Sequence, residues 1–108
     1  MIDNPKQVTK LMQKLKSQLP IPAKVTDVLI RGLRDKSINI SPDAQIEIID
    51  VLYLGDEGGI CCALRVINQE EISVMASLTH LRLPNTSPLS SDVRAYQASR
   101  VKKLSRMR

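Results

Sequence analysis

Residues 45–83 constrain the fold of this chain more than any other stretch. They read QIEIIDVLYLGDEGGICCALRVINQEEISVMASLTHLRL, three apolar runs rich in β-branched residues that are separated by two polar breaks, DEGG and NQEE. Such runs predict strands, and breaks this short predict antiparallel hairpins. The sequence therefore predicts a three-stranded antiparallel meander with strands near 45–54, 60–66 and 72–83. Flanking helices are expected to cover it, because a sheet of this size needs packing on at least one face.

The first of these runs has a second interpretation. Ser41-Pro42-Asp43 is typical of a helix start, so residues 41–54 could begin as a helix. Against this, the run is dominated by β-branched residues and leads through a glycine-rich break into another β-rich run. These features favour a strand from Gln45 to Leu54.

The apolar residues before the meander have the spacing of helices. Asn4 followed by Pro5 predicts a helix start, since Asn caps the free N–H groups and proline is harmless at the first helical position. Apolar residues then recur at helical spacing as far as the corner at Pro20. A second helix is predicted from Pro22 to about Lys36, which makes the N-terminal part a helical hairpin. Its expected buried residues are Val8, Leu11, Met12, Leu15, Val28, Leu29 and Leu33.

A basic helix is predicted over residues 88–106. Leu89, Val93 and Tyr96 have the spacing of one apolar face. The opposite side carries Arg94, Arg100, Lys102, Lys103 and Arg106. The predicted fold class is α+β, a single domain over residues 1–108 with an N-terminal helical hairpin, a three-stranded antiparallel meander and a C-terminal basic helix.

Composition excludes several classes of function. The chain has no Phe or Trp and only two tyrosines, Tyr53 and Tyr96, so a ligand site built on aromatic stacking is excluded. No apolar run approaches the roughly 18 residues that cross a bilayer, and the start, MIDNPKQ, does not resemble a signal peptide. The protein is expected to be cytosolic, with no membrane partner.

Three stretches carry a resemblance to known proteins. VLYLGDEGGICCALRV, SLTHLRL and the tail PLSSDVRAYQASRVKKLSRMR resemble a family of short cyanobacterial proteins to which no settled activity belongs. The resemblance implies a cytosolic single domain. It carries no functional residue over to this chain.

The charge of the chain changes sign twice. Residues 1–41 carry eight Lys or Arg against three acids, residues 42–86 carry two against seven, and residues 87–108 carry six against one. This segregation favours an anionic partner. The candidate binding residues are Lys6, Lys10 and Lys14 on the first helix and Arg94, Arg100, Lys102, Lys103 and Arg106 on the last. A solvated helix face is the alternative interpretation.

The turn Asp56-Glu57-Gly58-Gly59 is a second candidate site. Two carboxylates beside flexible backbone could bind a hard cation or a basic partner. The same composition is also usual in an exposed hairpin turn, and the spaced ligands of a calcium loop are absent.

The remaining reactive residues do not form a recognisable catalytic or metal set. Cys61 and Cys62 are adjacent in a predicted strand, point to opposite faces and are expected to be buried thiols. With His80 they lack the paired spacing of a zinc site, and a Cys62–His80 nucleophile would lack an orienting residue. No catalytic residue, metal or cofactor is therefore predicted.

The leading hypothesis is a non-catalytic binding or regulatory module whose basic helical faces engage an acidic protein partner. The alternative is nonspecific binding of nucleic acid, such as RNA, through the C-terminal helix. A metal-dependent enzyme using Asp56, Glu57 and His80 is the least favoured hypothesis. The sequence gives no oligomeric state.

Overall fold

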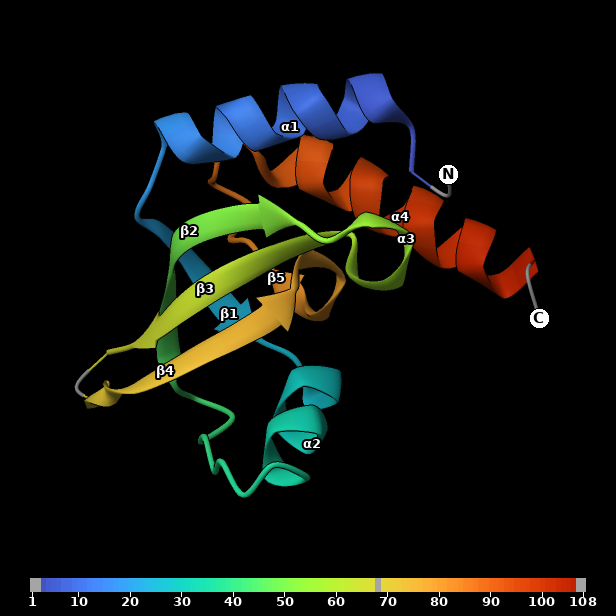
Figure 1. Ribbon diagram of the computed structural model, residues 1–108. Coiled ribbons are helices and arrows are strands. Elements are labelled where there is room, and N and C mark those ends of the chain that lie inside the picture. The colour runs from blue at the N-terminus through green and yellow to red at the C-terminus, as the bar shows by residue number, and fades with distance from the viewer. Residues whose placement is uncertain (1–2, 68, 107–108) are drawn as a thin grey trace.

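A curled antiparallel sheet with the strand order β4-β3-β2-β1-β5 forms the centre of the computed structural model (Figure 1). The structure describes residues 3–67 and 69–106, except for the side chains of residues 56, 57 and 69–73. The strands are β1 (Ile21–Val25), β2 (Gln45–Tyr53), β3 (Ile60–Val66), β4 (Gln69–Ser77) and β5 (Leu81–Arg82). The helices are α1 (Pro5–Ser17), α2 (Asp27–Arg34), the single turn α3 (Gly55–Gly58), the 3-10 turn η1 (Leu78–His80) and α4 (Ser90–Arg106). The predicted α+β class is confirmed.

The predicted antiparallel pairing of the three β-rich runs is confirmed. Strands β2, β3 and β4 pair in chain order, with Val51 opposite Cys62 and Cys62 opposite Ala76. An irregularity between Ile48 and Asp50 shifts the register, so Ile48 and Val51 both point inward although they are three residues apart. Residues 45–53 are therefore strand throughout, and the helical interpretation of this run is wrong.

The predicted N-terminal helical hairpin is wrong, because residues 21–25 form an additional strand. Ile21 and Ala23 are buried while Pro22 and Lys24 are exposed, the alternation of a strand rather than of a helix. Thr26 then caps α2 by accepting a hydrogen bond from the Leu29 N–H. As a consequence Val28, predicted to be core, is 50% exposed.

The predicted third strand is interrupted, which gives the sheet its fifth strand. The Ser77 hydroxyl accepts from the Thr79 N–H and caps η1, so the chain leaves β4 and returns as β5 beside β1. The second turn is shorter than predicted, since β4 already begins at Gln69; residue 68 lies outside the described residues.

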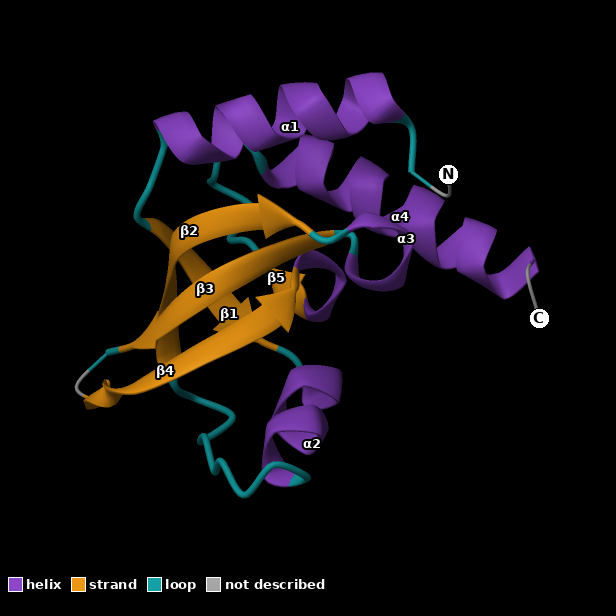
Figure 2. Cartoon of the chain, viewed as in Figure 1, coloured by secondary structure: helices purple, strands orange, loops and turns teal. Residues whose placement is uncertain are grey.

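Helices α1 and α4 lie next to each other and cover one side of the sheet, whereas α2 lies at its opposite end (Figure 2). The Asn4 side chain accepts from the Lys6 and Gln7 N–H groups and caps α1 as predicted. Val8, Leu11 and Leu15 of α1 are buried in one core with residues of all five strands. No helix among the described residues has the length and apolar character needed to cross a membrane.

Candidate binding surface

A buried ion pair ties the segment before α1 to α4. Asp3 Oδ2 and Arg100 Nη1 are 2.9 Å apart, and the two side chains are only 2% and 3% exposed. Charges removed from water need additional hydrogen bonds. Tyr53 Oη donates to Asp3 Oδ2 at 3.0 Å, and Tyr96 Oη donates to the same oxygen at 3.5 Å. Asp3, Tyr53, Tyr96 and Arg100 are called the buried polar cluster below.

The buried polar cluster also fixes the start of β3. Tyr96 Oη accepts a hydrogen bond of 2.9 Å from the Ile60 N–H. Burial raises the pKa of the Tyr96 phenol, and the Ile60 N–H opposes that rise. The phenol therefore stays protonated at neutral pH and keeps the hydrogen that it donates to Asp3. In this way the cluster joins the N-terminal segment, the end of β2, the start of β3 and α4.

The candidate turn Asp56–Gly59 packs against this cluster through its last glycine. Gly59 has φ +63°, and a Cβ there would lie 2.4 Å from Tyr96 Oη and 2.8 Å from the Arg100 guanidinium. Only glycine fits without displacing the cluster. The side chains of Asp56 and Glu57 lie outside the described residues, so the cation hypothesis for this turn stays a prediction.

The prediction that Arg100 belongs to the exposed basic face is wrong. Arg100 is one helical turn beyond Tyr96 and shares its buried face. Helical spacing could have indicated this, because Val93, Tyr96 and Arg100 follow each other at intervals of three and four. The partner could not have been identified from the sequence, since Asp3 lies 97 residues away.

Two other predicted basic residues are engaged within the protein. Lys14 Nζ and Asp92 Oδ2 are 2.8 Å apart across the junction of α1 and α4, and both side chains are about half exposed. Arg94 donates to the side chains of Asn85 and Ser90. Because the side-chain N–H groups of Lys14 and Arg94 already bond within the protein, both residues contribute less than predicted to a surface that binds a partner.

Five of the eight predicted basic residues are available to a partner. Among the side chains that the structure describes, none of the five has a carboxylate at ion-pair distance. Four are exposed and one, Lys103, is half-buried. We call this set the basic layer; it consists of Lys6, Lys10, Lys102, Lys103 and Arg106.

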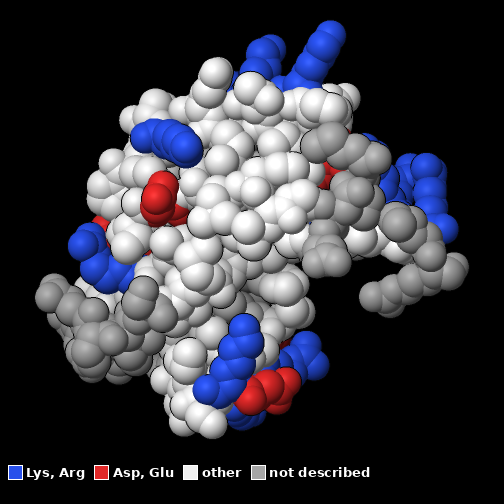
Figure 3. Space-filling model, in the orientation of Figure 1, with Lys and Arg blue, Asp and Glu red and all other residues white. Residues whose placement is uncertain are grey.

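The antiparallel packing of α1 and α4 determines where the basic layer lies. Asp3, just before α1, contacts Arg100 near the end of α4, while Lys14, near the end of α1, contacts Asp92 in the first turn of α4. The start of α1 therefore lies on the same side of the molecule as the second half of α4 (Figure 1), whereas Lys10 lies near Asp92 and Ala95 in the first half of α4. In Figure 3, Lys and Arg side chains project from α1 at the top of the molecule and from the end of α4 at its right.

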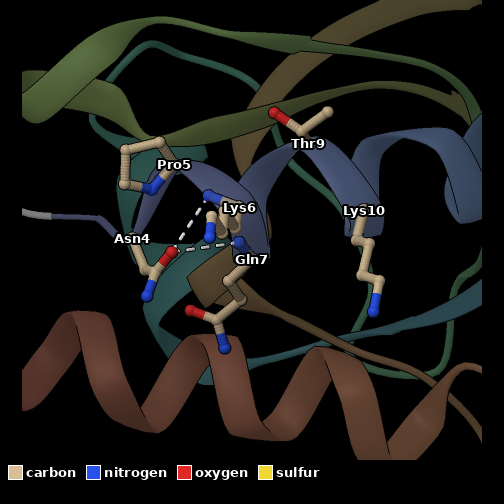
Figure 4. Close-up of a pocket in the computed structure, with 6 residues that line it drawn as sticks. All are labelled: Asn4, Pro5, Lys6, Gln7, Thr9 and Lys10. Carbon is tan, nitrogen blue, oxygen red and sulfur yellow. Dashed lines mark hydrogen bonds between the residues drawn. The ribbon is translucent and has the colours of Figure 1, made fainter.

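The surface around the basic layer is only shallowly hollowed. One hollow, of about 710 Å³, lies at the start of α1, where Gln7 and Lys10 extend towards α4 (Figure 4). A second, of about 200 Å³, lies between the two helices and is lined by Lys10 and Asp92 among others. The first volume is within the roughly 300–1,000 Å³ of small-molecule sites, but that hollow is lined by the start of a single helix and is wide open to solvent.

The cysteines and His80 do not come together. Cys61 and Cys62 are both buried and free, as predicted, whereas His80 is exposed in η1. Burial raises the pKa of the Cys62 thiol to about 12, with a smaller contribution from Cys61, so the thiol is protonated and unreactive at neutral pH. Among the described side chains, no group of three His, Cys, Asp or Glu could hold a metal ion.

Comparison with known proteins adds no functional evidence. No family model, curated protein or solved structure matches this chain. The resemblance to short cyanobacterial proteins therefore stays a prediction, and the function has to be argued from the geometry.

Proposed function

We propose that this protein is a non-catalytic binding module whose basic layer engages an acidic protein partner. The observation that carries the proposal is that five basic side chains of the neighbouring helices α1 and α4 form no ion pair with a described carboxylate. The acids of this region are already used, Asp3 by Arg100 and Asp92 by Lys14. A layer of uncompensated positive charge attracts anionic surfaces and raises the rate of their association.

A protein partner fits this layer better than a nucleic acid. Sequence-tolerant binding of single strands depends on exposed aromatic side chains on which bases stack. The two tyrosines are the only Phe, Trp or Tyr residues of this chain; Tyr96 is buried, Tyr53 is half-buried, and both donate to Asp3. A nucleic acid would therefore have to bind through its charged phosphate backbone alone. Its affinity would then fall steeply as the salt concentration is raised.

The test compares binding of a glutamate-rich peptide and of single-stranded RNA, each followed by fluorescence anisotropy over a range of salt. The informative variant is Lys6→Glu with Lys102→Glu, which reverses charge on both sides of the layer. The matched control is Lys24→Glu with Arg34→Glu, which gives the same net charge but changes exposed residues of β1 and α2.

We expect the peptide to bind more tightly than RNA at physiological salt, and the layer variant to lose at least about tenfold more affinity than the control. Equal losses in the two variants would show that net charge, and not the basic layer, governs binding. Tighter binding of RNA, lost in the layer variant, would favour the nucleic-acid alternative.

A further inference from the structure

A second surface lies between α2, η1 and the end of α4. Two adjoining hollows of about 520 and 320 Å³ share Val28 and His80. The first extends to Val101 and Leu104 of α4, and the second extends to Met75 of β4. We call the combined feature the α2–α4 groove; in Figure 3 the outline of the molecule is indented between the end of α4 and α2.

The α2–α4 groove gathers exposed apolar side chains. Among the described residues five large hydrophobic side chains are exposed, and three of them line this groove: Val28 at 50%, Met75 at 49% and Val101 at 57%. Scattered exposed hydrophobic residues are ordinary, but a concave cluster indicates a binding surface. The apolar face of a partner would remove these three side chains from water together.

The charges at the groove indicate what such a partner carries. Lys36 is its only charged lining residue among the described side chains, and no described carboxylate lines it. On α4, Ser105 lines the groove, and the exposed Lys102 is its neighbour on the helix surface because the two residues are three positions apart. The groove therefore borders the basic layer at Lys102. A second copy of this chain would bring like charges to the same place, which disfavours self-association there.

We propose that the α2–α4 groove binds the apolar face of an acidic amphipathic helix, whose acidic side chains meet Lys36 and Lys102. The groove is walled by side chains of two helices, an arrangement suited to a helix that inserts apolar residues at i, i+3, i+4 and i+7. This inference rests on the proposed function, because it describes the acidic partner in more detail. Burial of apolar area would supply the affinity for the partner helix, and the charges would fix its orientation in the groove.

The test uses three synthetic helical peptides, each measured by fluorescence anisotropy against the full chain. The first has Leu on one face and Glu on the other, the second replaces Leu by Ser, and the third replaces Glu by Lys. The groove variant is Val28→Ser with Val101→Ser. Its matched control is Ile49→Ser with Leu54→Ser, which removes the two exposed apolar side chains outside the groove. Thermal melts monitor folding of both variants.

We expect the Leu/Glu peptide to bind at least about tenfold more tightly than either other peptide, and to lose about tenfold in the groove variant but not in the control. Equal binding of the Ser/Glu peptide would overturn the groove inference and leave the proposed function standing. Equal binding of the Lys peptide would overturn the acidic character of the partner. Absence of binding by both Glu peptides would overturn the proposed function, and the inference with it.

Discussion

The buried ion pair between Asp3 and Arg100 makes the most specific prediction about stability. Asp3→Asn keeps the size of the side chain but removes the negative charge that faces a guanidinium only 3% exposed. Removing one member of a buried ion pair typically costs about 3–5 kcal/mol, because a charge held away from water then lacks its counter-charge. For 108 residues, an unfolding entropy of about 2.1 cal/mol/K per residue converts this into a fall in Tm of roughly 13–22 °C.

The assay is urea and thermal unfolding followed by circular dichroism at neutral pH, for wild type, Asp3→Asn, Arg100→Met and the double variant. The matched control is Lys14→Gln, which breaks the half-exposed pair with Asp92 and should cost less than about 1 kcal/mol. The double variant should be less destabilised than the sum of the single variants, since neither charge then stays buried without the other.

A loss in Asp3→Asn no larger than that in Lys14→Gln would contradict this reasoning. It would mean that water reaches Arg100 when the carboxylate is neutralised. Additive effects in the double variant would also contradict it, because they would show that Asp3 and Arg100 do not stabilise each other.

Three further predictions concern single residues. Gly59→Ala should cost about 2–4 kcal/mol, because a Cβ would collide with Tyr96 and Arg100 at a positive φ; Gly55→Ala, with φ +74° and open space, should cost clearly less in the same urea melts. Gly32→Ala should stabilise by about 0.5–1 kcal/mol, since nothing lies within 4 Å of a Cβ there and alanine favours the helix; a destabilised variant would contradict the open environment. The free energy of unfolding should fall between about pH 9 and pH 12, because the Cys62 thiol ionises near 9.0 when unfolded but only at about 12 when folded. Cys62→Ala should flatten this decline in pH-dependent urea melts, and an unchanged slope would refute the assignment.

The basic layer and the α2–α4 groove make α4 the functional centre of this interpretation. Its buried face carries Tyr96 and Arg100 and fixes the helix to the sheet and to Asp3. Its last two turns present Lys102 and Arg106 together with Val101. One element therefore links the charged surface to the apolar groove.

Local signals in the sequence were sufficient for the meander and for two helices. The β-branched runs at 45–53 and 60–66 form strands because their neighbours in sequence are also their neighbours in the sheet. Asn4 and Pro5 start α1 through contacts within a few residues. The segregation of charge was equally evident, since it depends on composition alone.

Tertiary structure decided the features that depend on residues far apart in the chain. The strand at Ile21–Val25 is stabilised by pairing with β2 and β5, more than twenty residues away, and this pairing outweighed the helical spacing of its apolar residues. The sequence predicts a solvent-facing Arg100 because its counter-charge, Asp3, lies at the other end of the chain. The basic layer likewise depends on the packing of α1 against α4, and the groove depends on the placement of α2 near the end of α4. The spacing of apolar residues and helix capping depend on residues within one or two helical turns. Ion pairs and strand pairing instead depend on which distant segments the fold brings together.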